Sequence, residues 1–201
     1  MSTIPKPVIS NPRPIEPGAS IGHVHLKVSD LNRAIAFYGG VLGFDVMQRY
    51  GDEAAFLSAG GYHHHIGLNT WESKGGSSPE FGTTGLYHFA IRYPTRRSLA
   101  NALRRLIDAA ISLEGASDHG VSEALYLRDP DGNGIELSWD RPQADWPLAE
   151  DGRLNMDTRP LSIKELLREA ADDAKVRKGC ITSMRHRRLR SAAFTVRRLW
   201  A

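Results

Sequence analysis

The strongest constraint on the fold is that this 201-residue chain runs twice through the same order of elements, a strand, a helix and three strands. In both halves, side chains that alternate between apolar and polar predict strands, and apolar side chains three to four residues apart predict the helix. The first half is expected to hold a strand at 21–28, a capped helix at 30–38 and strands near 43–50, 53–59 and 62–69. The second half is expected to hold a strand at 86–91, a helix at about 95–110 and strands near 111–118, 122–128 and 134–139.

This duplication predicts an α+β domain at residues 20–141, built from two βαβββ modules at about 20–72 and 85–141. Glycine, serine and proline between 75 and 82 mark the loop that crosses from one module to the other. The chain has no run of about 18 apolar residues, and segment 1–19 is a proline-rich arm, so neither a membrane span nor a signal peptide is indicated. We therefore expect a cytoplasmic protein.

Strand alternation also sorts the chemically active side chains, because successive residues point to opposite faces of a sheet. Histidines stand out, since seven of the eight lie between residues 23 and 119, and His23 and His88 occupy equivalent positions in the two halves. His64 is expected to face away from its two histidine neighbours. The face opposite the apolar side chains is expected to carry His23, His63, His65, Asn69, His88, Tyr126 and Glu136.

Histidine and carboxylate are the metal ligands that this composition offers. A lone cysteine, Cys180, allows neither an internal disulfide nor a thiolate metal cluster. Two imidazoles and one carboxylate from separate strands are the minimum set that holds a divalent transition metal and leaves several coordination positions open. His23, His88 and Glu136 make up such a set.

The net charge of +3 hides an asymmetry, because nine of the 26 Lys and Arg residues lie in 175–201, a segment without Asp or Glu. The rest of the chain is acidic overall, which argues against nucleic-acid binding by the main domain. Residues 142–161 are expected to be linker-like, and 162–201 to form a helical, Arg-rich tail. Two explanations of the tail are considered. The favoured one is that the tail comes from a truncated or frame-shifted reading frame, and the other is that it is a basic arm that docks on a neighbouring subunit.

Three segments, 61–71, 117–126 and 129–136, carry a resemblance to the vicinal oxygen chelate superfamily. This superfamily includes glyoxalase I, bleomycin and fosfomycin resistance proteins and extradiol ring-cleaving dioxygenases. The segments look most like the N-terminal domain of catechol 2,3-dioxygenases of the bacterial CatE type, and the resemblance covers about residues 18–165. It implies two βαβββ modules that form a cupped mixed sheet around a divalent metal.

The resemblance implies metal ligands at His23, His88 and Glu136, with Fe(II) as the expected ion and Mn(II) or another divalent metal as alternatives. The extradiol signature places a histidine before an apolar residue and a tyrosine, and then Asp-Pro-x-Gly and a glutamate. It implies catalytic roles for His119 and Tyr126. The residues expected to bind the substrate are His63, His65 and Asn69.

The function implied is extradiol cleavage of a small aromatic, catechol-like substrate by dioxygen. A glyoxalase-type isomerase or lyase, the first alternative, would use a fourth metal ligand from the last strand of the first half. Aligning Leu68 with Leu137 puts Gly67 at the position of Glu136, whereas a shift of two residues would present His65. The second alternative is a metal-free protein that binds a small aromatic antibiotic. Because related proteins continue into a second copy of the domain, we expect this chain to form a homodimer.

Overall fold

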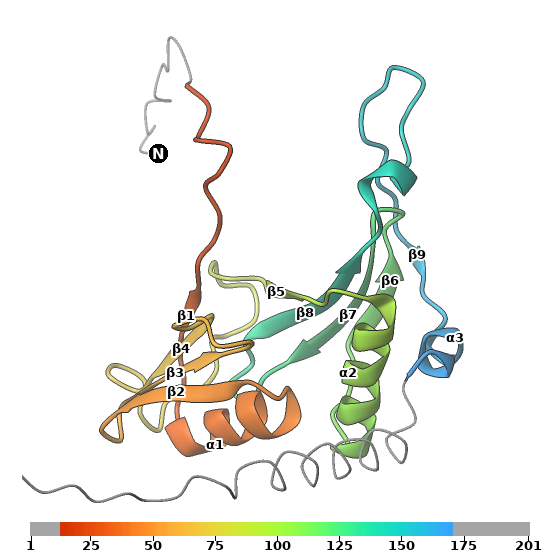
Figure 1. Ribbon diagram of the computed structural model, residues 1–201. Coiled ribbons are helices and arrows are strands. Elements are labelled where there is room, and N and C mark those ends of the chain that lie inside the picture. The colour runs from red at the N-terminus through yellow and green to blue at the C-terminus, as the bar shows by residue number, and fades with distance from the viewer. Residues whose placement is uncertain (1–12, 171–201) are drawn as a thin grey trace, which may run out of the picture.

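The computed structural model describes residues 13–170, and Figure 1 shows them as two neighbouring sheets with helices along one side. Part of the proline-rich arm, Cys180 and most of the predicted Arg-rich tail lie outside the described residues. Within residues 13–170, no helix has the length and apolar character that crossing a membrane requires.

The first sheet has the strand order β1-β4-β3-β2, with β1 parallel to β4 and the other pairs antiparallel. Asp30 caps helix α1, because its carboxylate accepts a hydrogen bond from the Arg33 amide at 2.9 Å. The helix then widens into a π-helical turn, in which the Leu42 amide donates to the Phe37 carbonyl at 3.0 Å. The elements are β1 (Val24–Lys27), α1 (Leu31–Ile35), η1 (Ala36–Val41), β2 (Asp45–Tyr50), β3 (Ala54–Ser58) and β4 (Ile66–Asn69).

The second sheet repeats this topology as β5-β8-β7-β6 and adds a short strand, β9, at its edge. A capping box between Thr95 and Ser98 starts helix α2, whose buried Leu99, Leu103 and Leu106 recur every three to four residues. The elements are β5 (Phe89–Arg92), α2 (Arg96–Asp108), β6 (Gly115–Asp118), β7 (Ser122–Arg128), β8 (Gly134–Asp140) and β9 (Arg159–Pro160). The predicted α+β fold with two βαβββ modules is therefore confirmed.

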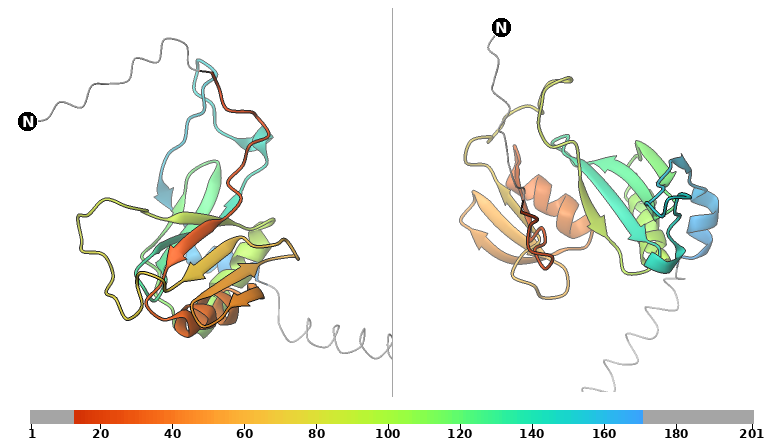
Figure 2. Two further views of the ribbon diagram at one scale, coloured as in Figure 1. Left: turned by 90° about the vertical axis from the view of Figure 1, so that its left-hand side faces the viewer. Right: turned by 90° about the horizontal axis from the view of Figure 1, so that it is seen from above.

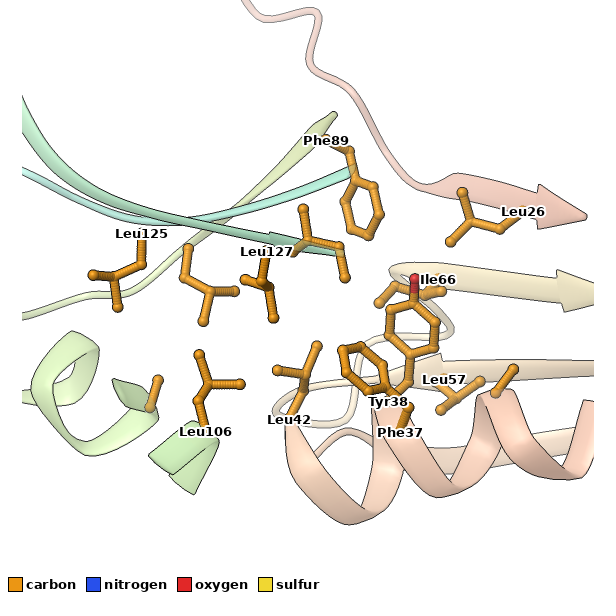
Figure 3. Close-up of a cluster of buried hydrophobic side chains, with 14 of the residues drawn as sticks. Leu26, Phe37, Tyr38, Leu42, Leu57, Ile66, Phe89, Leu106, Leu125 and Leu127 are labelled. Carbon is orange, nitrogen blue, oxygen red and sulfur yellow. The ribbon is translucent and has the colours of Figure 1, made fainter. Parts of the chain in front are cut away.

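One apolar core joins the two modules. Figure 3 shows Leu106 and Leu127 of the second module continuing into Leu42 and Tyr38 of the first, in the layer between the sheets and their helices. Phe89 of β5 reaches the same layer from the edge of the second sheet. Because the modules share this core, their sheets lie side by side over a common layer of helices, as Figure 2 shows from above.

A buried cluster of hydrogen bonds also ties the turn between β7 and β8 to the first module. Asp129 is 5% exposed, and its Oδ1 accepts from the amides of Asp131 and Asn133 at 2.9 and 2.8 Å. Its Oδ2 accepts from the Tyr38 hydroxyl at 2.9 Å and from Asn133 Nδ2 at 2.8 Å. The Ser29 hydroxyl donates to Asp131 Oδ1 at 2.6 Å. The turn that leads into β8 is thus fixed against the first helix.

Replacing Tyr38 by phenylalanine should lower the free energy of unfolding by about 1.5 kcal/mol, because the buried Asp129 carboxylate loses one donor. Burial and the neighbouring Asp129 raise the pKa of the Tyr38 hydroxyl far above its ordinary value, so this group stays protonated and donates. Urea-induced unfolding measures the change. The matched control is Tyr50→Phe on β2, at a side chain 66% exposed, which should change stability by less than about 0.5 kcal/mol. Equal losses in the two variants would contradict this assignment.

The segment after β8 folds back onto the second module. A short 3-10 helix, η2 (Gln143–Asp145), is followed by a loop that Figure 1 shows projecting beyond the sheet, and β9 then pairs with β6. Helix α3 (Ile163–Arg168) packs on α2, with Leu166 fully buried and Arg96 ion-paired to Glu169. The segment predicted to be linker-like therefore contains an edge strand of the second sheet.

Candidate active site

Four side chains in or directly beside four neighbouring strands form one chain of polar contacts on the second sheet. His88 stands directly before β5, Glu136 lies in β8, Tyr126 in β7, and His119 directly after β6. Tyr126 is paired with Glu136 in the antiparallel β7–β8 ladder, so both side chains point to the same face. Ordinary strand register is therefore sufficient to bring the pair together.

The Glu136 carboxylate sits at the centre of this chain. Its Oε2 lies 3.0 Å from His88 Nε2, and its Oε1 lies 3.5 Å from the Tyr126 hydroxyl. The same hydroxyl lies 2.7 Å from His119 Nε2. The side chain of Glu136 is 15% exposed and that of His88 is 32% exposed. The carboxylate is therefore largely withdrawn from water while both of its oxygens face polar partners.

Tyr126 connects the carboxylate to the distant histidine. Burial, followed by the charge and hydrogen bond of Glu136, raises the pKa of Tyr126 to about 12. The phenol consequently keeps its hydrogen at neutral pH. Of its two neighbours, His119 at 2.7 Å is nearer than Glu136 at 3.5 Å, so His119 is the stronger hydrogen-bond partner.

His119 is held from two sides. Its amide donates to the Ser122 carbonyl at 2.8 Å. Its Nδ1 lies 3.1 Å from the main-chain oxygen of Asp157 and 3.2 Å from the Thr158 hydroxyl. Sequence reasoning missed these two partners, because a main-chain oxygen has no side-chain signature and Asp157 is 38 residues away along the chain.

His23, the third predicted metal ligand, belongs to the other module. It stands directly before β1, as His88 stands before β5. It lines a cavity of about 220 Å³ together with Ala90, and Ala90 is the strand neighbour of Glu136. Among residues 13–170, no three His, Cys, Asp or Glu side chains come together in a group that could hold a metal. The structure thus joins His88 to Glu136 and leaves His23 on the wall of an adjacent cavity.

The consecutive histidines before β4 do not follow strand alternation, because β4 begins only at Ile66. His64 was expected to face away from its neighbours, and this expectation is wrong: its Nδ1 lies 2.8 Å from Nδ1 of His63. The ring centroid of His64 also lies 4.4 Å from that of His23. A run of three histidines was the only sequence signal for this contact.

His65 and Asn69, two of the predicted substrate-binding residues, each have a local partner. Nδ1 of His65 lies 3.3 Å from the Ala59 amide and 3.1 Å from the Ser58 hydroxyl. An amide can only donate, so Nδ1 is the acceptor and the neutral ring carries its hydrogen on Nε2. Asn69 is 8% exposed, and its Oδ1 accepts from the Trp71 amide at 3.2 Å.

The position of a fourth metal ligand is occupied by glycine. The two parallel ladders, β1 with β4 and β5 with β8, confirm the predicted alignment of Leu68 with Leu137. Gly67 therefore holds, in the first module, the place that Glu136 holds in the second. A Cβ added at Gly67 would lie 2.9 Å from the imidazole ring of His25. The ring of His25 thus fills the space that a ligating side chain would need.

Residues 20–137 match the family model of the Glyoxalase/Bleomycin resistance protein/Dioxygenase superfamily. The chain belongs to this superfamily. The matched residues extend from before β1 into β8 and include His88, Tyr126 and Glu136.

Two curated relatives of this superfamily member are named as dioxygenases. Catechol-2,3-dioxygenase of Bacillus subtilis (strain 168) is 44% identical over 155 residues, which are 77% of this chain and 53% of that protein. Biphenyl-2,3-diol 1,2-dioxygenase 3 of Rhodococcus globerulus is 36% identical over 123 residues, which are 60% of this chain and 63% of that protein. The chain thus spans less than two thirds of the length of either relative.

A solved structure shows the same fold. A glyoxalase/dioxygenase from Nostoc punctiforme superposes with a TM-score of 0.53 at 20% identity, over 66% of this chain and 100% of the other. The likeness extends over the whole of that protein, so the two proteins share this fold.

Proposed function

We propose that this superfamily member is an extradiol ring-cleaving dioxygenase that opens a catechol-like ring with dioxygen. The proposal rests on the chain of contacts that runs from His119 through Tyr126 and Glu136 to His88. His119 and Tyr126 are side chains that can transfer protons, and Glu136 and His88 are side chains that can bind a metal. The names of the two relatives, catechol-2,3-dioxygenase and biphenyl-2,3-diol 1,2-dioxygenase, support the same reaction class.

The proposed metal is Fe(II), with Mn(II) or another divalent ion as alternatives, and His23, His88 and Glu136 would hold it. His88 and Glu136 fit this role, because their facing nitrogen and oxygen atoms are 3.0 Å apart. An imidazole nitrogen and a carboxylate oxygen at this separation could both bind one divalent ion. His23 is proposed as the third ligand from its equivalent position in the first module. When bound, an ion with three protein ligands supplies open positions for both catechol hydroxyls and for dioxygen.

The chain's own residues supply the proton chemistry and the substrate contacts. His119 accepts the proton of a catechol hydroxyl through Nε2, the ring nitrogen that faces the Tyr126 hydroxyl. Tyr126 keeps its hydrogen and donates it to the developing charge on a substrate oxygen. His65 lines the same cavity as His23. His63 and Asn69 complete the proposed set of substrate-binding residues.

A glyoxalase-type isomerase or lyase has less support. That chemistry would use a fourth ligand from β4, where Gly67 offers no side chain and the His25 ring fills the space. His65, the other candidate, has its Nδ1 lone pair engaged and its hydrogen on Nε2, so neither nitrogen of the neutral ring is free to bind a metal.

We also propose that the protein is a homodimer in the cytoplasm. Each copy of the chain would contribute one pair of βαβββ modules to the dimer. A reducing compartment would help to keep iron in the ferrous state.

The proposed function is tested by metal analysis of the full chain purified without air, followed by addition of catechol and dioxygen. We expect stoichiometric iron or manganese, a yellow ring-cleavage product and equal consumption of catechol and dioxygen. Bound metal without ring cleavage of catechol or of a biphenyl-diol would contradict the proposal and favour the isomerase. A chain that binds no divalent metal would point instead to a metal-free binding protein.

A further inference from the structure

The return of the chain after β8 brings a main-chain oxygen against the ring of His119. Nδ1 of this ring faces the Asp157 carbonyl at 3.1 Å, and Nε2 faces the Tyr126 hydroxyl at 2.7 Å. The imidazole is therefore contacted at both nitrogens, one from the sheet and one from the segment between β8 and β9. A histidine held in this way has a preferred position for its hydrogen.

The two contacts differ in chemistry. A carbonyl oxygen can only accept a hydrogen bond, whereas a tyrosine hydroxyl can donate or accept. If Nδ1 lacked a hydrogen, its lone pair would face the lone pairs of the Asp157 oxygen. With the hydrogen on Nδ1, that contact is a hydrogen bond, and Nε2 of the neutral ring is left to accept from Tyr126. The Nδ1–H form pairs the ring with both the Asp157 oxygen and the Tyr126 hydroxyl. In the Nε2–H form the Asp157 oxygen loses its donor, and Nδ1 could accept only from the more distant Thr158 hydroxyl at 3.2 Å.

We propose that the main-chain carbonyl of Asp157 fixes His119 as the Nδ1–H tautomer and so keeps Nε2 available to take a proton inside the site. Asp157 is thus a positioning residue that acts through its main chain, and the segment expected to be a linker forms part of the active site. The catalytic meaning of this tautomer rests on the proposed function, whereas the tautomer itself does not.

The backbone around Asp157 is held well enough for this role. Two residues further along the chain, β9 pairs with β6 through Arg159 and Asp118. The Asp157 amide lies 3.4 Å from the His119 carbonyl, so the two residues face each other in main chain as well as in side chain. Arg159 also forms an ion pair with the Asp157 carboxylate at 3.1 Å. These contacts keep the Asp157 oxygen aligned with the ring.

The tautomer also sets the direction of the hydrogen bond with Tyr126. In the neutral state, the Tyr126 hydroxyl donates to Nε2 of His119. Once Nε2 has taken a proton, it becomes a donor, and the Tyr126 hydroxyl is free to turn its hydrogen toward Glu136 or a substrate oxygen. One proton gained at Nε2 therefore redirects the hydrogen of Tyr126 toward the centre of the site.

The test is ¹⁵N nuclear magnetic resonance of histidine side chains in the full, metal-free chain at pH of about 9, where an ordinary imidazole is neutral. The His119 signals are identified by their loss in His119→Gln. We expect a protonated Nδ1 and an unprotonated Nε2 in the wild-type chain. Detection of the Nε2–H form would overturn the proposal. Because no substrate or metal is used, a chain that shows the Nδ1–H form but cleaves no ring would refute the proposed function alone.

Two variants identify the group that selects the tautomer. Tyr126→Phe removes the hydroxyl at Nε2, and Thr158→Val removes the hydroxyl that lies 3.2 Å from Nδ1. Both leave the Asp157 carbonyl in place, so the Nδ1–H form should persist in each. A shift to the Nε2–H form in Tyr126→Phe would assign the choice to the phenol, and a shift in Thr158→Val would assign it to the threonine. Either shift would overturn the role of Asp157.

Discussion

Replacing His88 by alanine is expected to lower the affinity for divalent metal by more than about 100-fold, and to lower ring cleavage at limiting metal by at least that factor. Loss of a group that merely supports a ligand already costs up to about 100-fold, so loss of a ligand should cost more. His88 is the imidazole that faces Glu136 at 3.0 Å, and its side chain is 32% exposed. The His88→Ala variant should therefore keep the fold of the wild type and lose the bound metal.

The readout is metal content after dialysis against a metal buffer, with circular dichroism to show that the variant is folded. Glu136→Gln should lose metal to a similar degree, because the carboxamide has no charge to offer the ion. His25→Gln is the matched control, since this exposed imidazole packs beside Phe56 and Trp71. Retention of metal and ring cleavage by His88→Ala would refute the ligand assignment, and His23→Ala tests the third ligand in the same assay.

Substituting Gly134 by alanine is expected to lower the free energy of unfolding by about 3 kcal/mol, through overpacking against backbone. Gly134 is the first residue of β8 and lies beside the start of β5. A Cβ there would overlap the carbonyl oxygen of Tyr87 and lie 3.0 Å from the Cβ of His88. The overlap is with main chain, so it can be relieved only by moving one strand away from the other.

Thermal unfolding of the two forms measures this loss, which corresponds to a fall in Tm of roughly 10 °C for a chain of this length. Gly40→Ala is the control, because a Cβ at Gly40 would meet nothing within 4 Å and alanine favours helix. Its stability should be unchanged or slightly higher. Since the displaced strand leads from His88, metal affinity should fall with stability in Gly134→Ala. If Gly134→Ala were as stable as the wild type, β8 and the start of β5 could not lie so close that a Cβ at residue 134 overlaps the Tyr87 carbonyl oxygen.

Much of the fold was predictable because its signals are local. The alternation of apolar and polar residues identified strands in both halves, and the expected bounds of β7 agree with the structure. The agreement is poorer for β4, which begins at Ile66 although alternation suggested a start near 62. The alternation of apolar and polar residues indicates which side chains would point inward if a segment were extended. Because residues 62–65 are not in a strand, alternation does not predict where their side chains point. The misplacement of His64 follows from this difference.

Some contacts of the candidate site and its surroundings also follow from local sequence patterns, whereas others depend on how distant segments pack. That Tyr126 and Glu136 share a face follows from the period of two within β7 and β8 and from their antiparallel pairing. The hydrogen bond between Tyr38 and Asp129 joins residues 91 positions apart. In the sequence, Asp129 begins an Asp-Pro-x-Gly motif and Tyr38 is the last residue of a predicted helix. Their contact depends on how the modules pack, which no local pattern encodes.

Local patterns in the chain were enough to predict the duplicated α+β fold and the shared face of His88, Tyr126 and Glu136. They left Gly67 and His65 as alternatives at the place of a fourth ligand, and the register of the two parallel ladders selected Gly67. Three contacts became known only from the folded chain: the Asp157 oxygen meets His119, Gly134 gives room to the start of β5, and His23 lies against His64. The physical reason is that side-chain identity and strand period are properties of neighbours in the chain. Contacts with main-chain atoms and between modules arise only when distant segments pack together.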